Sequence, residues 1–328
     1  LKDQIYSPAF AFSNSGTVYL AYYDKLYKQI RFSAGSQVNS GTSNGLNAAS
    51  CQVVAGNSIA GREPGAYLSL AIVTVNNKDI ACLVWYNQNS NKLQYSYKSD
   101  VTTNKTGTAT TGWSAAQDIF TGGGQYCQIV ADKDNHLHIA AYVGGKVKYA
   151  YLPSYNGAIR TCTVDTGNVG NNLTLDVGLE TVSTDNNRPI PVIGYYSSYG
   201  KPKYAKLPAT SWFNASNAVI AAADWVPSDG VDASNAYTGE WEASYVPSTS
   251  SIILQDEDKV NVGLWKDDNG IIKNSYKTGT TVGTCTYDNS KIAECPSEAY
   301  GNGTKNGVLC YLTDGGENME TAQMRGSN

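Results

Sequence analysis

The sequence predicts an all-β chain built from one repeated unit, on three observations. First, an apolar run ending in an aromatic pair, then a polar turn and a second short strand, recurs along the 328 residues. Its first copy is Thr17–Asp24 followed by Gln29–Ala34, a pattern typical of a β-hairpin. Second, Gly (32) and Tyr (24) are abundant while charged residues are only 16%, which suits short strands joined by many turns. Third, the hairpin strands are apolar on both faces, so we expect each sheet to be covered on both sides.

Six copies of the hairpin can be aligned by the aromatic pair or its equivalent. These are Tyr22-Tyr23, Trp85-Tyr86, Ala141-Tyr142, Tyr195-Tyr196, Leu264-Trp265 and Cys310-Tyr311. Successive pairs lie roughly 50 to 70 residues apart, which is long enough for a four-stranded sheet and favours a β-propeller over a solenoid. We therefore expect a single β-propeller with six blades of about four antiparallel strands, seven blades being the alternative.

The predicted propeller is one domain, residues 1–328. Its blades are expected at residues 6–60, 61–121, 122–170, 171–238, 239–295, and 296–328 together with 1–5. Variable fourth strands are expected at Ser50–Ala55, Ala115–Phe120 and Arg160–Val164. The segment Leu1–Ile5 is expected to join the last blade, because this would close the ring and remove two exposed sheet edges.

Charge and hydropathy argue against two classes of partner. The net charge is −4 with a pI near 5.3, and no cluster of Lys and Arg is available to neutralise phosphates, so we expect no nucleic-acid partner. No run approaches the eighteen or so apolar residues of a membrane span, so no membrane insertion is expected. Because the chain opens on Leu1, we interpret it as a mature or excised segment of an exported protein, extracellular, on the cell surface or periplasmic.

Seven cysteines are present, an odd number, so at least one stays unpaired within the chain. Cys285 and Cys295 flank the turn-like segment Asp288–Lys291 and are expected to face each other across a hairpin as a disulfide. Cys82 and Cys310 lie in apolar strands and are expected to be buried thiols. The chain lacks Cys-x-x-Cys, which excludes zinc-ribbon and thioredoxin-like sites.

The two histidines, His136 and His138, are spaced to share one face of a strand, and Asp132 and Asp134 precede them. These residues stand where other repeats have a strand-connecting turn, so we interpret them as turn formers. The alternative is a metal site at Asp132, Asp134 and His136. We expect no cofactor, with structural Ca²⁺ at an Asp-rich turn as the alternative.

Catalytic signatures are sparse. Gly-x-Ser-x-Gly, the P-loop and the dinucleotide fingerprint are all missing. If the protein were an enzyme, the paired carboxylates of a glycosidase would come from predicted channel-lining residues, namely Glu180, Glu242 and Glu298. Whether the chain is an enzyme stays open, and the sequence favours a non-enzymatic role.

Irregular insertions are where a repeat protein becomes specific. The largest runs from Ser211 to Gly239, and smaller ones span Gly35–Gly65 and Val101–Gly112. We expect the aromatic side chains of the largest insertion and its flank to bind the ligand. These are Trp212, Phe213, Trp225, Tyr237 and Trp241.

The Tyr-Tyr-Asp that ends one strand, and the later Val147-Lys148-Tyr149-Ala150, resemble the repeats of secreted and surface-attached bacterial β-propeller proteins. More loosely, the layout is similar to six-bladed fucose-binding lectins, in which Arg, Glu and aromatic side chains hold ligands between blades. Only the first unit offers such an arginine, Arg31, and the other five carry Gln, Lys or Glu there. Sialidases share the fold class, but their Ser-x-Asp-x-Gly-x-Thr-Trp box is missing.

Together these observations predict an exported binding or adhesion module that recognises a carbohydrate or protein partner on a surface through its rim loops. A glycoside hydrolase or lyase using channel carboxylates is one alternative. A structural subunit that self-assembles into a surface filament is the other.

Overall fold

The computed structural model describes residues 5–13, 15, 17–34, 51–56, 65–101, 112–166, 173–182, 185–196, 202–206, 226–228, 252–256, 259–266, 272–278, 281–286, 293–300, 306–313 and 318–325. Side chains are described mainly between residues 7 and 177. By its contacts the chain divides into two compact units, 1–144 with 148–161 and 145–147 with 162–328. Each unit is described by itself.

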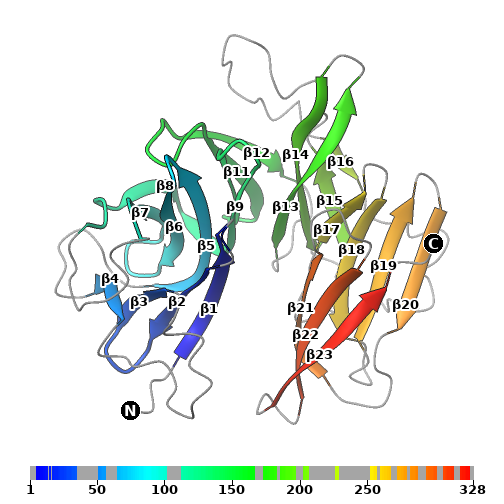
Figure 1. Ribbon diagram of the computed structural model, residues 1–328, viewed down its shortest axis with the longest axis horizontal. Helices are drawn as coiled ribbons and strands as arrows, with labels where there is room; N and C mark the ends of the chain where they lie inside the picture. The colour runs from blue at the N-terminus through cyan, green and yellow to red at the C-terminus, as the bar shows by residue number, and fades with distance from the viewer. Residues whose placement is uncertain are drawn as a thin grey trace. The chain divides into compact units, whose positions relative to one another are not determined.

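Three four-stranded sheets make up the first unit, the third extending by a few residues beyond it (Figure 1). In every sheet of the first unit, strands that follow each other in sequence lie side by side and run antiparallel. The first sheet is β1 (Ile5–Phe12), β2 (Val18–Asp24), β3 (Gln29–Ala34) and β4 (Gln52–Gly56). The second is β5 (Ala66–Val75), β6 (Lys78–Asn87), β7 (Lys92–Lys98) and β8 (Gln117–Thr121). The third is β9 (Gly123–Ala131), β10 (Leu137–Val143), β11 (Lys146–Leu152) and β12 (Arg160–Asp165).

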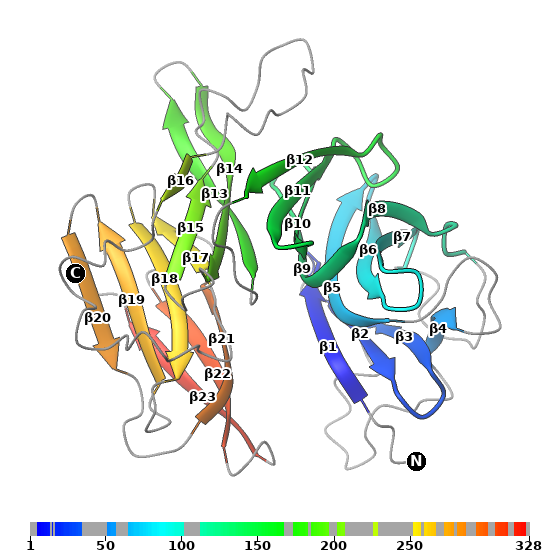
Figure 2. The same cartoon turned by 180° about the vertical axis from the view of Figure 1, so that it is seen from behind.

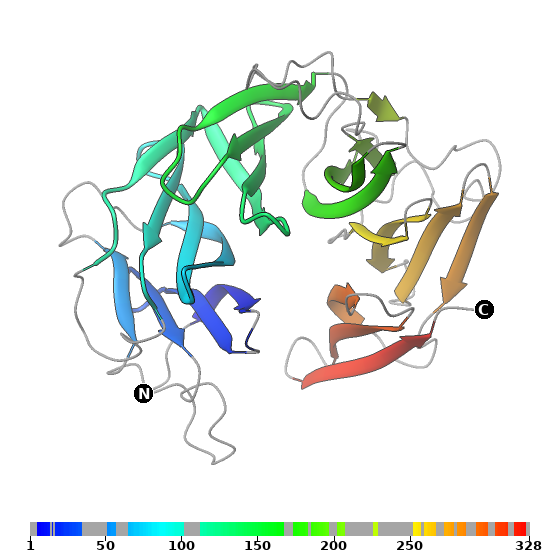
Figure 3. The same cartoon turned by 45° about the horizontal axis from the view of Figure 1, so that its top comes forward.

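Two four-stranded sheets and one three-stranded sheet make up the second unit among the described residues (Figure 3). The fourth sheet is β13 (Thr174–Val182), β14 (Asp185–Tyr196), β15 (Pro202–Lys206) and β16 (Val226–Ser228). The fifth is β17 (Ile252–Asp256), β18 (Lys259–Lys266), β19 (Ile272–Thr278) and β20 (Thr281–Thr286). The last is β21 (Ala293–Tyr300), β22 (Asn306–Thr313) and β23 (Asn318–Arg325).

The prediction of an all-β chain of antiparallel four-stranded sheets is confirmed. The expected fourth strands appear as β4, β8 and β12, within two residues of the predicted bounds. The number of blades, the closure of a ring and the single domain stay predictions. Of the segment expected to complete the last blade, Leu1–Gln4 lie outside the described residues, whereas Ile5 pairs with Asp24 in the first sheet.

Neighbouring sheets of the first unit pack face to face, with β1, β5 and β9 side by side (Figure 2). Between the first and second sheets a core forms around Tyr19, Phe32, Leu83 and Trp85. Between the second and third sheets a separate core forms around Cys82, Tyr95, Ile129 and Ile139. Strand β6 contributes to both cores, and every residue of it after Lys78 is buried. The expectation of sheets covered on both faces is therefore confirmed for the second sheet.

A β-bulge stands at the same place in the first strand of each of these three sheets. Ser7, Tyr67 and Tyr126 all have positive φ, at 48°, 55° and 53°, and each lies at a shift in register. Bulges turn a strand and free its backbone groups. Here the freed amide of Tyr67 bonds Ser7 Oγ at 3.2 Å, and the Cys127 thiol donates to the carbonyl of Tyr67. The bulges thus link adjacent sheets, and the aromatic pattern gave no sign of them.

Among the residues that the structure describes, no helix is long and apolar enough to cross a membrane.

Candidate functional site

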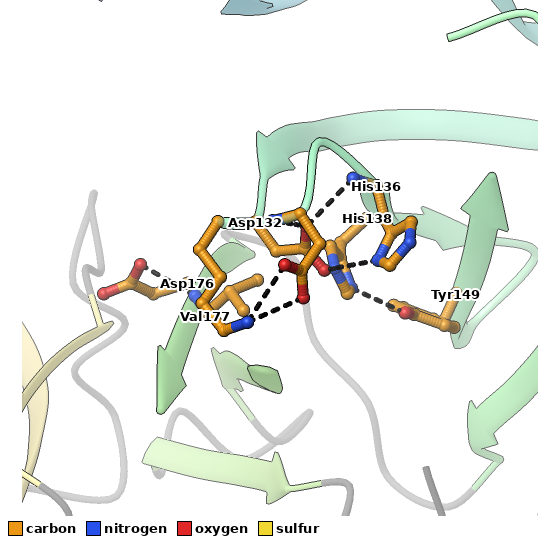
Figure 4. A network of polar contacts seen from close by, with 8 residues as sticks. Asp132, His136, His138, Tyr149, Asp176 and Val177 are labelled. Atoms are coloured by element: carbon orange, nitrogen blue, oxygen red, sulfur yellow. Dashed lines mark hydrogen bonds and ion pairs between the residues drawn. The ribbon is translucent and has the colours of Figure 1, made fainter. Parts of the chain in front are cut away.

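The histidines and the carboxylate expected at the β9–β10 turn meet at one point (Figure 4). Asp132 follows β9, His136 precedes β10, and His138 is the second residue of β10. Asp132 Oδ2 lies 2.8 Å from His136 Nδ1 and 3.2 Å from His138 Nε2. Its other oxygen, Oδ1, accepts the backbone amides of Asp134 at 2.8 Å and His136 at 2.9 Å. One buried carboxylate therefore receives four hydrogen bonds.

The chemistry of the partners fixes the protons on this cluster. A carboxylate only accepts hydrogen bonds, so His136 Nδ1 and His138 Nε2 must carry hydrogens. In a neutral His138 ring Nδ1 is then an acceptor, and Tyr149 OH, 2.8 Å away on β11, donates to it. The result is a continuous relay from Tyr149 through His138 to Asp132.

Burial and hydrogen bonding set the charge states in the relay. Burial lowers the pKa of His138, and the bond to Asp132 only partly offsets this, so the ring is neutral at pH 7. Burial opposes ionisation of Asp132, but the hydrogen bonds from His136 and His138 together outweigh it and hold the pKa of Asp132 well below its usual range. Burial also raises the pKa of Tyr151, whose ring packs against both histidines, to about 12.

The predicted metal alternative names residues that the structure does bring together. One ligand atom each from Asp132, Asp134 and His136 lie within 4.8 Å of one another. Both oxygens of Asp132 already accept hydrogen bonds, however, and Asp134 pairs with Lys133 Nζ at 2.8 Å. A cation would have to displace the proton that His136 donates to Asp132. The turn is satisfied without an ion, and the metal site stays a prediction.

A second polar network lies at the β2–β3 turn of the first sheet. Asp24 Oδ1 accepts the backbone amides of Leu26 at 3.0 Å and Tyr27 at 3.1 Å. Asp24 Oδ2 lies 2.9 Å from Arg31 Nε, and the Arg31 guanidinium carbon stands 5.1 Å from the centre of the Tyr27 ring. Arg31 is thus engaged with Asp24 and Tyr27.

The β6–β7 turn of the second sheet has the same backbone frame. Asn87 Oδ1 accepts the amides of Asn89 at 3.1 Å and Ser90 at 3.2 Å. The fourth residue after Asn87, Asn91, has φ of 54°, as Lys28 after Asp24 has 51°. In place of the ion pair, Asn87 Nδ2 donates to Gln94 Oε1 at 3.1 Å, and Gln94 donates onward to Asp118 at 3.0 Å.

The other predicted site residues are placed only in part. Glu180 lies in β13 opposite Arg188, and Glu298 lies in β21 opposite Leu309. These two glutamates stand on the first strands of different sheets. Glu242 and all five predicted ligand-binding aromatics lie outside the described residues; these are Trp212, Phe213, Trp225, Tyr237 and Trp241. Their roles stay predictions.

The hairpin expected between Cys285 and Cys295 is wrong. Cys285 lies in β20 opposite Asn274, whereas Cys295 lies in β21, the first strand of the next sheet. The turn-like residues between them connect two sheets instead of two paired strands. A disulfide between them stays a prediction, since the structure describes no side chain there. Cys82 is a buried free thiol, as expected, and burial raises its pKa to about 12.

Several residues of these networks were not singled out from the sequence, among them Tyr149, Leu26 and Tyr27. Tyr149 belongs to the repeated apolar-Lys-Tyr-Ala strand, so its role as a donor to His138 is hidden in a packing motif. Leu26 and Tyr27 lie in a turn, where the hairpin pattern predicts only polarity. The sequence did contain one sign of them, because an aliphatic and an aromatic residue lie between two lysines in a turn where polar residues are expected.

Comparisons with known proteins identify likenesses of fold. No protein-family model matches the chain, and no curated protein matches it by sequence. Among solved structures, the Aleuria aurantia lectin in complex with Fucα1-6GlcNAc matches with a TM-score of 0.58 at 10% identity, over 97% of this chain and 91% of the lectin. AofleA of Arthrobotrys oligospora matches with a TM-score of 0.54 at 12% identity, over 99% of this chain and 84% of that chain.

Enzymes appear among the same matches. The NanB sialidase of Streptococcus pneumoniae matches with a TM-score of 0.53 at 10% identity, over 95% of this chain and 66% of the sialidase.

Another structure of the Aleuria aurantia lectin, described as a six-bladed β-propeller with a novel mode of fucose recognition, has a TM-score of 0.53 at 10% identity and covers 98% of this chain and 91% of the lectin. The chain is therefore an all-β protein of antiparallel sheets whose fold is similar to that of propeller lectins and sialidases.

Proposed function

We propose that this protein is a carbohydrate-binding β-propeller. The observation that carries the proposal is the likeness, over nearly the whole length of both chains, to a lectin whose solved complex contains a fucosylated sugar. The aromatic side chains predicted at the rim, from Trp212 to Trp241, supply the surface that sugar rings stack on. We keep export to the cell exterior or periplasm as part of the proposal.

The six sheets form, in this proposal, one closed six-bladed ring. Phe10 and Phe12 of β1 are 58% and 68% exposed. Counted from the bulge, Phe10 corresponds to Leu70 of β5 and Ile129 of β9, and both of these are buried in the core shared with the preceding sheet. The repeat therefore assigns Phe10 to a contact with another sheet, and ring closure covers it with the three-stranded sheet β21–β23.

Ring closure has a direct test in protein stability. Replacing Phe10 and Phe12 together by Ala is expected to lower the free energy of unfolding by at least about 2 kcal/mol, as for core aromatics. Replacing the exposed residue Lys133 by Ala is the matched control. A double variant as stable as the wild type in chemical denaturation contradicts the closed ring.

Sugar binding is tested with a glycan array followed by calorimetry on the glycans that are retained. Binding to at least one class of glycan is expected, together with protection of the protein against thermal unfolding at saturating ligand. An array without any retained glycan, while pull-downs capture a protein ligand, overturns the carbohydrate proposal in favour of protein recognition.

A glycoside hydrolase or lyase is the second candidate, because a sialidase and a polysaccharide lyase are among the similar structures. In this case two of Glu180, Glu242 and Glu298 supply the carboxylates, and replacing each of the three by Gln in turn identifies the pair by the loss of turnover of a glycoside panel. Wild-type protein that binds glycans but releases no sugar from the panel removes the enzyme candidate.

A further inference from the structure

The β9–β10 turn of the third sheet carries side chains that its backbone does not require. The amide of Asp132 donates to the carbonyl of His136 at 3.0 Å, and the amide of His136 donates back to Asp132 Oδ1 at 2.9 Å. The β1–β2 turn of the first sheet is closed by the same two bonds, between Ser13 and Thr17, at 3.0 and 3.3 Å. A serine and a threonine therefore suffice for this turn.

The second sheet closes the equivalent hairpin with still less. Its β5–β6 turn consists of Asn76 and Asn77, both with positive φ, at 52° and 59°. Neither a carboxylate nor an imidazole stands in it. The carboxylates and the imidazole of the β9–β10 turn are thus additions that the repeat does not explain.

Three of these added side chains converge on one point. One ligand atom each from Asp132, Asp134 and His136 lie within 4.8 Å of one another. Asp132 Oδ2 and His136 Nδ1 are 2.8 Å apart, and their side chains are 0% and 20% exposed. The side chain of Asp134 is 45% exposed. Two ligands are therefore held inside the turn, and one exposed carboxylate can close on an ion that arrives from solvent.

Contacts to two other strands hold this turn in place. Asn135 Oδ1 accepts the backbone amide of Thr74 on β5 at 3.1 Å, and the amide of Asn135 donates to the carbonyl of Asp132 at 3.1 Å. The ring of His136 packs edge-on against Tyr151 of β11, with 5.6 Å between ring centres. Because these contacts order the ligands in advance, an ion that binds here pays little for ordering them.

The mixture of donor atoms selects the kind of ion. One imidazole nitrogen with two carboxylate oxygens suits Zn²⁺ and related first-row ions, whereas Ca²⁺ and Mg²⁺ take oxygen ligands. To bind through Nδ1, neutral His136 carries its hydrogen on Nε2 instead. Asp132 then gives up one of its four hydrogen bonds and keeps the bond from His138 and those from two backbone amides (Figure 4).

We propose that Asp132, Asp134 and His136 form a binding site for Zn²⁺ or a related first-row divalent ion. Each residue supplies one ligand atom, and water completes the coordination. Lys133 competes with the ion, because its Nζ lies 2.8 Å from the carboxylate of Asp134. This ion pair is exposed on both sides and is weak enough to be displaced. The inference is independent of the proposed carbohydrate binding.

The test is a calorimetric titration of metal-free protein with Zn²⁺, Ca²⁺ and Mg²⁺ at neutral pH. We expect one Zn²⁺ per chain, with Ca²⁺ and Mg²⁺ bound at least about 100-fold more weakly. Asp134→Asn should weaken Zn²⁺ binding about tenfold or more, and His136→Gln about 100-fold or more. Lys133→Ala should tighten binding about two- to fivefold, because the competing ion pair is removed.

Nuclear magnetic resonance provides a second readout, since the chain has only two histidines. Zn²⁺ should shift the ring-nitrogen signals of His136 more than those of His138. The matched control is Asp118→Asn in the second sheet, which removes another exposed carboxylate paired with a lysine and should leave the affinity unchanged.

Three results would overturn the site. The first is wild-type protein that binds no Zn²⁺ up to roughly 1 mM. The second is Zn²⁺ binding of wild-type strength in both Asp134→Asn and His136→Gln, which places the ion elsewhere. The third is equal affinity for Zn²⁺ and Ca²⁺, which removes the imidazole from the ligands. Because Asp134 is exposed, its variant keeps the test decisive if His136→Gln fails to fold.

Discussion

The β2–β3 turn of the first sheet and the β6–β7 turn of the second share one backbone frame but differ in chemistry. Each turn begins with a residue whose side-chain oxygen accepts hydrogen bonds from two backbone amides. This residue is Asp24 in the first sheet and Asn87 in the second. Beyond these shared hydrogen bonds, the first sheet has a buried ion pair between Asp24 and Arg31. In the second sheet the equivalent interaction is a hydrogen bond between two neutral side chains, Asn87 and Gln94. The first two sheets therefore share the acceptor that shapes the turn, whereas its side-chain partner differs, being Arg31 in the first sheet and Gln94 in the second.

The third sheet extends the comparison, because its polar cluster sits at the other end of the hairpin. Its β10–β11 turn is a pair of glycines with positive φ, which needs no side-chain acceptor. The buried carboxylate stands instead at the β9–β10 turn, where Asp132 receives two backbone amides and two histidines. A carboxylate or amide that accepts backbone amides recurs in all three sheets, while its position does not.

The largest effect is expected from removing the ion pair between Arg31 and Asp24 in the first sheet. Arg31→Gln leaves the Asp24 carboxylate buried without its cation, and we expect the free energy of unfolding to fall by about 3 to 5 kcal/mol. Adding Asp24→Asn recreates the neutral chemistry of the second sheet and should recover most of the loss. Chemical denaturation of both variants measures this. A double variant no more stable than the single variant would show that the neutral side chains of the β6–β7 turn cannot replace the ion pair of the β2–β3 turn.

The next largest effect is expected at Asp132. Asp132→Asn replaces an acceptor by an amide group that cannot accept from both histidines, leaving a buried N–H unsatisfied, at a cost of about 1 to 3 kcal/mol. Asp134→Asn, which affects only the exposed pair with Lys133, is the control and should be nearly neutral. Thermal unfolding distinguishes the two, and equal losses would contradict the role given to the buried carboxylate.

Acid should weaken the third sheet in two stages. Burial lowers the pKa of His138, so the unfolded chain binds a proton that the folded chain does not, and stability falls as the pH drops below about 6.5. The pKa of Asp132 is also lowered, so its contribution is present above about pH 4 and is lost below it. Unfolding measured from pH 8 to pH 3 should show both stages in the wild type. The His138→Gln variant should not show the loss of stability that begins below about pH 6.5. A wild-type free energy of unfolding that stays constant between pH 7 and pH 5 would refute the role given to His138.

The smallest effect on stability is expected from exchanging the exposed tips. Leu26→Asn with Tyr27→Ser should change the free energy of unfolding by no more than about 0.5 kcal/mol, because both side chains are exposed. Lys28→Asn should be neutral or slightly stabilising, since Asn tolerates the positive φ of this position better than Lys. Circular dichroism melts check both. A large loss would mean that Tyr27 supports the fold.

Much of the architecture was accessible from the sequence. The aromatic pairs, the turn residues and strands apolar on both faces determined an all-β chain of antiparallel sheets, because alternation and turn chemistry are local properties. The same locality explains the error at Cys285 and Cys295. A turn-like segment between two strands looks alike whether it joins paired strands or consecutive sheets, and only the pairing of Cys285 with Asn274 distinguishes them.

What only the tertiary structure decided is which polar side chains converge. The spacing of His136 and His138 predicted a shared face, but the choice of Asp132 as their common acceptor and of Tyr149 as the donor to His138 depends on how β9, β10 and β11 align. Likewise, the sequence by itself determined that Tyr27 lies in a turn. The contacts of Arg31 with the Tyr27 ring and with Asp24 depend on the pairing of β2 with β3. This pairing brings together residues that are separated in the sequence.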